Sequence, residues 1–123
     1  MIEGKPSATA LRVAVRRAAH QLLDKPLIFE DPLALTIVGG DRGSAVARDE
    51  ISRADSAGGA ALRAFIAARS RFAEDRIADA VAAGCRHVVV LGAGLDTFAY
   101  RNRFAAEGVV VYEVDHPATQ AWK

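Results

Sequence analysis

Residues 88–97 read VVVLGAGLDT, an unbroken apolar run followed by two closely spaced glycines. The run predicts a strand over residues 86–91 that is buried on both faces, as in a parallel sheet beneath helices. A second apolar run, VVVYEV at 109–114, predicts the next strand, and residues 96–106 between the two are expected to form a short helix. Strand, glycine turn, helix and strand in this order form a βα-β unit, which predicts an open α/β fold.

The segment before the first strand is expected to be helical. A helix is predicted over 7–23, where Ser7 can cap it and apolar residues recur at helical spacing. A short helix is predicted over 32–38, and residues 41–59 are interpreted as a mostly connecting segment. An alanine-rich helix is predicted over 60–83, and the glycine that follows it is the residue type that commonly ends helices.

Length and composition limit the classes of protein that are possible. The chain has 123 residues, a formal net charge of +1 and one cysteine, Cys85. A net charge near zero argues against a nucleic-acid-coating protein or a polybasic membrane binder. The longest apolar run is too short to span a bilayer, and a single cysteine excludes an internal disulfide and any multi-cysteine metal site. We therefore expect a soluble, cytoplasmic protein that binds neither nucleic acid nor membranes.

The predicted elements fall into two parts. Residues 1–59 are expected to form a helical N-terminal cap segment, and residues 60–123 the start of an α/β domain. Two strands alone do not make a stable sheet of this class, and parallel sheets need cover on both faces. The sequence therefore has the form of a truncated opening of a larger, doubly wound domain.

The glycine turn is the predicted ligand site. In open α/β sheets, ligands bind outside the carboxyl ends of the strands, and Gly92 and Gly94 allow the backbone to approach a ligand closely. An acid about twenty residues further on, at the tip of the next strand, is placed to accept hydrogen bonds from ribose hydroxyls. Asp115 occupies that position, and Glu113 precedes it on the same face of the strand. The pattern predicts a nucleoside-containing ligand.

Two such ligands are weighed. The dinucleotide fingerprint needs a third glycine where this chain has Thr97, and Asp96 beside it puts a carboxylate where a pyrophosphate needs N–H donors. S-adenosylmethionine has no phosphate and carries a sulfonium, an ammonium and a carboxylate, so a turn with an acid nearby suits it better. Asp96 is equally well interpreted as a helix N-cap.

The long helix offers a group for the ligand's carboxylate. Its apolar residues share one face at 100° per residue: Leu62, Phe65, Ile66, Ala73, Ile77 and Ala80. Arg69 projects from this face, and an arginine that faces a core needs an anionic partner. That partner is either a sheet carboxylate or the ligand's carboxylate, which the forked guanidinium can clamp. Four charged residues of the helix fall on other faces and are expected to be solvated: Arg63, Arg71, Glu74 and Asp75.

The histidines do not predict a metal site. His20 lies on a polar side of its helix, and no two of His20, His87 and His116 have metal-ligand spacing on a common element. No nucleophile elbow or P-loop pattern is present. We therefore predict no metal ligand.

A family resemblance adds to this interpretation. VLGAGLDTFAYR at 90–101, followed by YEVDHP at 112–117, resembles the leucine carboxyl methyltransferase family. Within that family it is similar to the bacterial branch of S-adenosylmethionine-dependent O-methyltransferases, which are often linked to polyketides. The resemblance extends to ARSRFAED at 68–75 and to the N-terminal segments TALR at 9–12 and KPLIFEDP at 25–32.

The resemblance implies a class I, Rossmann-like methyltransferase fold, of which this chain would hold the helical N-terminal extension and the first two parallel strands. Gly92 and Gly94 would line the methionine moiety of the cofactor, Asp115 would bind its ribose and Arg69 would pair with its carboxylate. Arg12 matches a basic position that assists this pairing in some relatives. The cofactor-binding residues expected from pattern and resemblance together are Arg12, Arg69, Gly92, Ala93, Gly94, Glu113 and Asp115.

The resemblance also implies a reaction, the transfer of a methyl group from the sulfonium to a carboxylate or hydroxyl oxygen of a small molecule. An ionised carboxylate acceptor requires no general base, so catalysis would rest on positioning, and no catalytic acid or base is named. Family members are much longer than this chain, whose length favours a different hypothesis, a non-catalytic fragment or association module. An NAD(P)-dependent oxidoreductase is the third alternative, which Asp96 and Thr97 disfavour.

Overall fold

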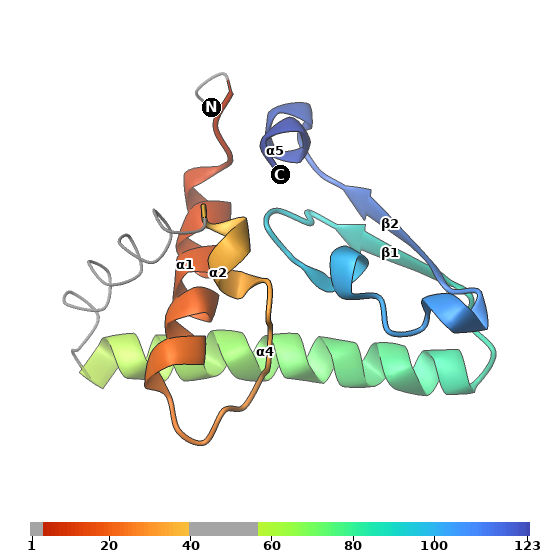
Figure 1. Ribbon diagram of the computed structural model, residues 1–123, viewed down its shortest axis with the longest axis horizontal. Coiled ribbons are helices and arrows are strands. Elements are labelled where there is room, and N and C mark those ends of the chain that lie inside the picture. Colours follow the sequence, from red (N-terminus) through yellow and green to blue (C-terminus); the bar gives the residue numbers. More distant parts are fainter. Residues whose placement is uncertain (1–3, 40–56) are drawn as a thin grey trace.

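The computed structural model describes residues 4–39 and 57–123 (Figure 1). In chain order its elements are α1 (Ala8–Leu23), α2 (Ala34–Ile37), α4 (Ala57–Ala82), β1 (His87–Leu91), the 3₁₀ helices η1 (Phe98–Arg101) and η2 (Ala105–Glu107), β2 (Val110–Val114) and α5 (Pro117–Trp122). In the described ranges no helix combines the length and the apolar character that crossing a membrane requires.

Helix α1 confirms the first predicted helix and carries the hydrophobic core. The Ser7 hydroxyl accepts a hydrogen bond from the Ala10 amide, so it caps the helix as expected. The core cluster gathers residues of α1, α2 and the glycine turn: Ala14, Val15, Ala18, Ala34, Val38 and Leu95. The α1–α2 pair therefore packs directly against the turn that follows β1.

Helix α4 is longer at its start than the sequence predicted. Residues 57–59 are helical, although they were interpreted as part of the connecting segment; residues 41–56 of that segment lie outside the described residues. Glycine lowers helix propensity by about 1 kcal/mol, but a helix that has formed propagates at little cost. The end is as predicted: Gly84 has a φ of 104°, and the Cys85 amide bonds to the Ala80 carbonyl at 2.9 Å.

The buried face of α4 differs from the predicted apolar face. Ile66 is buried as predicted, and Ala67 and Val81, outside the predicted stripe, are buried as well, whereas Leu62 and Phe65 are 41% and 62% exposed. Helix α4 runs across α1 (Figure 1), and this contact contributes to the face that it buries. Hydrophobic spacing alone favoured a neighbouring stripe, because apolar residues occur on both.

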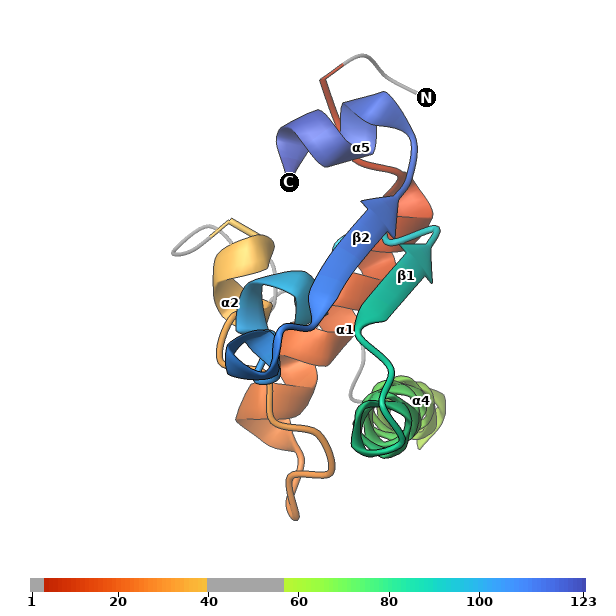
Figure 2. The ribbon, with the colours of Figure 1, turned by 90° about the vertical axis from the view of Figure 1, so that its right-hand side faces the viewer.

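Strands β1 and β2 are parallel, as predicted, and Figure 2 shows them side by side with α5 following the carboxyl end of β2. Their register pairs His87 with Val110 and Leu91 with Val114. The expected burial on both faces is wrong for the described residues, since Val89 and Leu91 are 57% and 75% exposed. Successive side chains alternate between faces, and the described helices pack on one another rather than on this face of the sheet.

The connection between the strands is not the single helix predicted over 96–106. It contains η1 and η2, separated by residues 102–104. The Asn102 side chain accepts from the Phe104 amide at 3.1 Å and donates to the Val109 carbonyl at 2.9 Å, so it competes with helical hydrogen bonds. Asp96 accepts from the Phe98 amide at 2.7 Å, but the N-cap position of η1 is held by Thr97, so Asp96 precedes the cap that the sequence assigned to it.

An ion pair joins the end of α1 to α4. Arg63 was expected to be solvated, but it is 5% exposed and donates to both oxygens of Asp24, at 3.1 and 3.0 Å. His20, expected on a polar side, is fully buried: its Nε2 accepts from the Phe29 amide, and its Nδ1 lies 2.9 Å from Asp24. The hydrogen bond from Arg63 lowers the pKa of Asp24 below 3.8, against the opposing effect of burial.

Replacing Asp24 with Asn is expected to destabilise the fold by about 1–3 kcal/mol, because it removes a carboxylate charge that pairs with the buried Arg63 guanidinium between the end of α1 and α4. Urea unfolding at pH 7 measures the change. The control is Asp75→Asn, since the Asp75–Arg71 pair is exposed and should contribute less than about 1 kcal/mol. Equal losses in the two variants would contradict this account.

The pH dependence of the same variant tests the lowered pKa. Because the folded pKa of Asp24 lies below the unfolded value near 3.8, the unfolded chain takes up the proton first as pH falls. The contribution of Asp24 is therefore complete above about pH 5 and is lost as pH falls through the folded pKa. The difference in unfolding free energy between wild type and Asp24→Asn should shrink as pH falls below about 4. A difference that stays the same from pH 5 down to pH 3 would refute the assignment.

Candidate functional site

The glycine turn after β1 adopts the close-approach conformation that the sequence predicted. Gly92 and Gly94 have φ values of 61° and 53°, in the left-handed region that side chains disfavour. A Cβ built on Gly94 would also lie 3.2 Å from the Cβ of Ala10. Glycine at position 94 is thus favoured by its backbone angle and by the close packing of α1.

Asp115 lies directly after β2, at the edge of the sheet where the glycine turn emerges. Its Oδ2 accepts from the Gly94 amide and its Oδ1 from the His116 amide, both at 2.5 Å. Both backbone hydrogen bonds lower the pKa of Asp115, and the bond from Gly94 has the larger effect. Asp115 is therefore an ionised acceptor, held against the turn.

A cavity of about 390 Å³ brings most of the predicted site together. Five of the seven expected binding residues line it: Arg69, Gly92, Ala93, Gly94 and Asp115. Its other walls come from the start of α1, through residues such as Thr9 and Val13, and from Asp96. The cavity therefore lies between the carboxyl end of the sheet, α1 and α4.

The other two expected residues do not line this cavity. Arg12 is exposed on α1. Glu113 pairs with the Nζ of Lys123 at 2.5 Å, and the Lys123 side chain is fully buried. Alternation along β2 placed Glu113 and Asp115 on one face, but Asp115 follows the end of the strand, where the pleat no longer directs its side chain.

Arg69 reaches the cavity by a different route from the one expected. The predicted apolar stripe placed it facing a core, whereas the structure leaves its side chain exposed at the cavity wall. The alternative prediction for Arg69 is a salt bridge to a sheet carboxylate. Among the described residues, no such ion pair is present. Arg71, two residues further along α4, pairs with Asp75 and lines a separate cavity.

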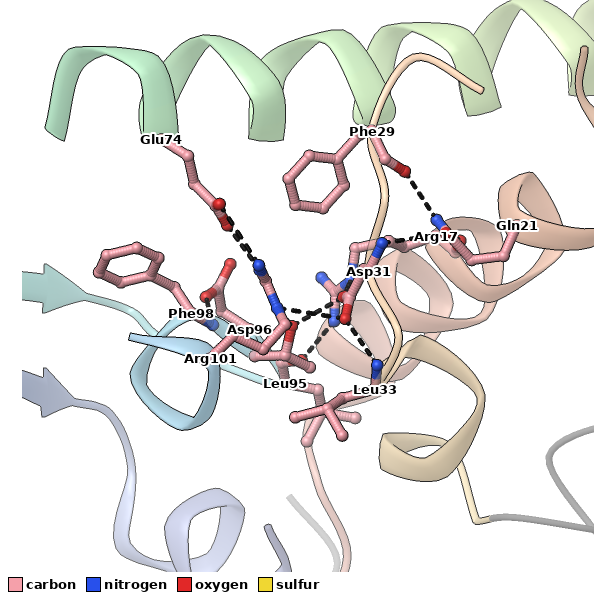
Figure 3. Close-up of polar contacts among 11 residues, drawn as sticks. Arg17, Gln21, Phe29, Asp31, Leu33, Glu74, Leu95, Asp96, Phe98 and Arg101 are labelled. Carbon is pink, nitrogen blue, oxygen red and sulfur yellow. Dashed lines mark hydrogen bonds and ion pairs between the residues drawn. The ribbon is translucent and has the colours of Figure 1, made fainter. Parts of the chain in front are cut away.

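A buried polar network behind the turn was missed by the sequence analysis. Asp31, fully buried, is surrounded by donors from α1 and η1, and Figure 3 shows it between Arg17 and Arg101, with Glu74 reaching Arg101 from α4. Arg17 is 4% exposed. A signal was present, because Arg17 lies among the apolar residues of its helix and so required an acid. Nothing local identified Asp31 as that acid, since its position before a proline is explained by a turn or cap alone.

The titratable residues of the described ranges form no metal site. Within residues 4–39 and 57–123, no group of three or more His, Cys, Asp or Glu side chains is placed to hold a metal ion. His116 caps α5 by accepting from the Ala118 amide, and His87 stacks on Tyr112 at 6.0 Å between ring centroids.

Comparisons with known proteins show the family of this chain. A Mycobacterium tuberculosis protein named "Putative S-adenosyl-L-methionine-dependent methyltransferase" is 41% identical over 123 residues, which cover 94% of this chain and 35% of that protein. A protein of the same name from Mycobacterium marinum is 41% identical over 127 residues, covering 95% of this chain and 39% of its own length. This chain thus spans less than two fifths of the length of these relatives. The sequence model described as leucine carboxyl methyltransferase matches residues 10–123, the glycine turn, Asp115 and Arg69 included. The chain belongs to the leucine carboxyl methyltransferase family.

Proposed function

We propose that this chain provides the cofactor-binding part of an S-adenosylmethionine-dependent O-methyltransferase that acts on a carboxylate or hydroxyl of a small molecule. The observation that carries the proposal is the cavity at which the glycine turn, Asp115 and Arg69 meet. The names of the mycobacterial relatives support the cofactor. The description of the family, which specifies a carboxyl group, supports an oxygen acceptor.

The residues around the cavity fit this cofactor. Arg69 offers a forked cation to its carboxylate, and Asp115, ionised and acceptor-only, suits its ribose hydroxyls. Asp96 adds a second negative charge near the place where the cofactor's cationic groups would lie. A cavity with charged groups of both signs matches a zwitterionic ligand that also carries a sulfonium.

A dinucleotide fits the same turn less well. Its pyrophosphate would need free amide N–H groups at the start of the following helix. Here the carboxylate of Asp96 already takes the Phe98 amide, at 2.7 Å. The helix itself is only the single 3₁₀ turn η1, so it has little dipole to attract an anion. These contacts favour a cofactor without phosphate.

The chain's own residues would act by binding and orientation. The bound cofactor would supply a methyl group on a positively charged sulfur. Arg69 would fix the carboxylate of the cofactor and Asp115 its ribose, and the glycine turn would let the methionine moiety approach the backbone. An ionised carboxylate acceptor needs no proton removed, so holding donor and acceptor in line is the main catalytic contribution. No acid or base in the cavity is assigned to catalysis.

The helical N-terminal segment is part of this proposal. Residues 1–59 would act as a cap over the cofactor, and residues 60–123 would supply the beginning of the α/β domain. The cap is supported by the cavity lining, to which Thr9, Ala10 and Val13 of α1 contribute. The cofactor would thus be enclosed between the two parts.

Calorimetric titration of the 123-residue chain with S-adenosylhomocysteine and, separately, with NAD tests the proposal. We expect saturable binding of the first and none of the second at the same concentrations. S-adenosylhomocysteine, the product of methyl transfer, is used because it keeps the carboxylate, ammonium and ribose that the cavity is proposed to contact. Binding of NAD without S-adenosylhomocysteine would replace the proposal with an oxidoreductase, and binding of neither would favour the non-catalytic hypothesis for this chain.

Arg69→Ala should weaken S-adenosylhomocysteine binding at least about tenfold, because a charge-assisted hydrogen bond to the carboxylate is lost. Arg69→Lys keeps the charge but not the fork, so we expect an intermediate affinity. Arg71→Ala is the matched control, since it removes an exposed arginine of the same helix that does not line the cavity, and it should change affinity less than about twofold. Equal effects of Arg69→Ala and Arg71→Ala would contradict the role of Arg69.

A further inference from the structure

The buried Asp31 carboxylate accepts three hydrogen bonds and pairs with two arginines. Its Oδ2 accepts from Arg17 Nε at 2.9 Å and from the Thr97 hydroxyl at 2.7 Å. Its Oδ1 accepts from the Leu33 amide at 3.0 Å and lies 3.3 Å from Arg101 Nε, an ion-pair contact. The charge, which would be costly if unpaired, is thus compensated.

Arg17 and Thr97 both hold the segment that follows the glycine turn. Arg17 Nη2 donates to the Leu95 carbonyl at 2.5 Å, while its Nε remains on Asp31. Thr97 is 1% exposed, and its hydroxyl reaches the same carboxylate. The chain is therefore tied at positions 95 and 97, immediately after Gly94 and on the side of the segment that packs against α1.

The network extends from the turn to α4. Arg101 Nε donates to the Thr97 hydroxyl at 2.9 Å, and Arg101 Nη2 pairs with Glu74 at 2.5 Å (Figure 3). Burial opposes the charge of Arg101, but Glu74 and Asp31 outweigh it and raise its pKa. Two arginines thus balance two carboxylates, and the helix that carries Arg69 is connected to the glycine turn through Glu74.

We propose that Thr97 and Asp31 form a positioning pair that holds the glycine turn in its ligand-binding conformation. Neither residue is expected to touch the ligand; they act through the backbone of residues 92–97. Thr97 stands where a dinucleotide fingerprint would have a third glycine, so the chain has at this point a buried anchor that glycine could not provide. The part of this inference that concerns the ligand rests on the proposed function.

Amide hydrogen exchange of the 123-residue chain tests the pair without any ligand. Thr97→Val removes the hydroxyl at nearly constant shape. It should speed exchange of the Ala93, Gly94 and Asp96 amides at least about tenfold, because a hydrogen bond to a charged group no longer holds the turn. Amides within α1 should keep their wild-type rates. Thr97→Ser, which restores the hydroxyl, should return the exchange rates of the turn amides to within about threefold of wild type.

Two further variants make this test specific. Thr36→Val is the matched control, because Thr36 is an exposed threonine of α2, and it should leave the turn unchanged. Arg17→Lys keeps a cation beside Asp31 but cannot also reach the Leu95 carbonyl. It should therefore speed hydrogen exchange of the same turn amides, so the test remains decisive even if Thr97→Val folds poorly. Wild-type exchange in the turn for both Thr97→Val and Arg17→Lys, or equal acceleration in α1, would overturn the positioning role.

Titration with S-adenosylhomocysteine tests the consequence for binding. Thr97→Val should bind at least about tenfold more weakly than wild type, whereas Thr97→Ser and Thr36→Val should stay within about threefold. Unchanged affinity in Thr97→Val, together with faster exchange in the turn, would overturn the link between the pair and the ligand. If wild type binds no S-adenosylhomocysteine, the proposed function fails for this chain, and the exchange rates still decide whether the pair positions the turn.

Discussion

The buried carboxylate of Asp31 is the constraint on which the arrangement of this structure depends. A charge with no solvent contact is stable only when donors surround it, and its donors come from segments far apart in the chain. Arg17 brings α1, while Thr97 and Arg101 bring the connection that follows β1. Satisfying one acid therefore places the N-terminal helices against the glycine turn, and the small apolar core around Ala14 and Leu95 fills the space between them.

Helix α4 uses its charged residues for two separate tasks. Arg63 and Glu74 are paired within the structure, with Asp24 and Arg101, and these pairs connect the helix to α1 and to the turn. Arg69, by contrast, is exposed at the wall of the cavity. The pairing of Arg63 and Glu74 neutralises charge inside the fold, whereas the position of Arg69 keeps its guanidinium available to a ligand. The proposed function depends on this difference.

Residues close together in the sequence were predicted well, and those whose role depends on a distant partner were not. The two strands, the turn at Gly92 and Gly94 and the acid at Asp115 follow from local apolar runs, glycine conformation and strand length. Glu113 was assigned to the site by the same alternation, but the partner that holds it is Lys123, directly after α5. The predicted face of α4 was wrong because periodicity identifies a stripe but not the helix that will cover it.

Local chemistry was therefore sufficient for the class of fold and for placing a cavity at the carboxyl ends of the strands. Arg69 lines that cavity, but from an exposed position that the apolar stripe did not predict. The support of the glycine turn depends on contacts across 66 and 78 residues of sequence. These are the hydrogen bonds of Thr97 to Asp31 and of Arg17 to Leu95. The physical reason is that backbone conformation responds to neighbouring residues, whereas a buried charge is balanced by whichever groups the folded chain brings within about 3 Å. Which acid balances Arg17, and that the pair supports the glycine turn, became known only from the folded chain.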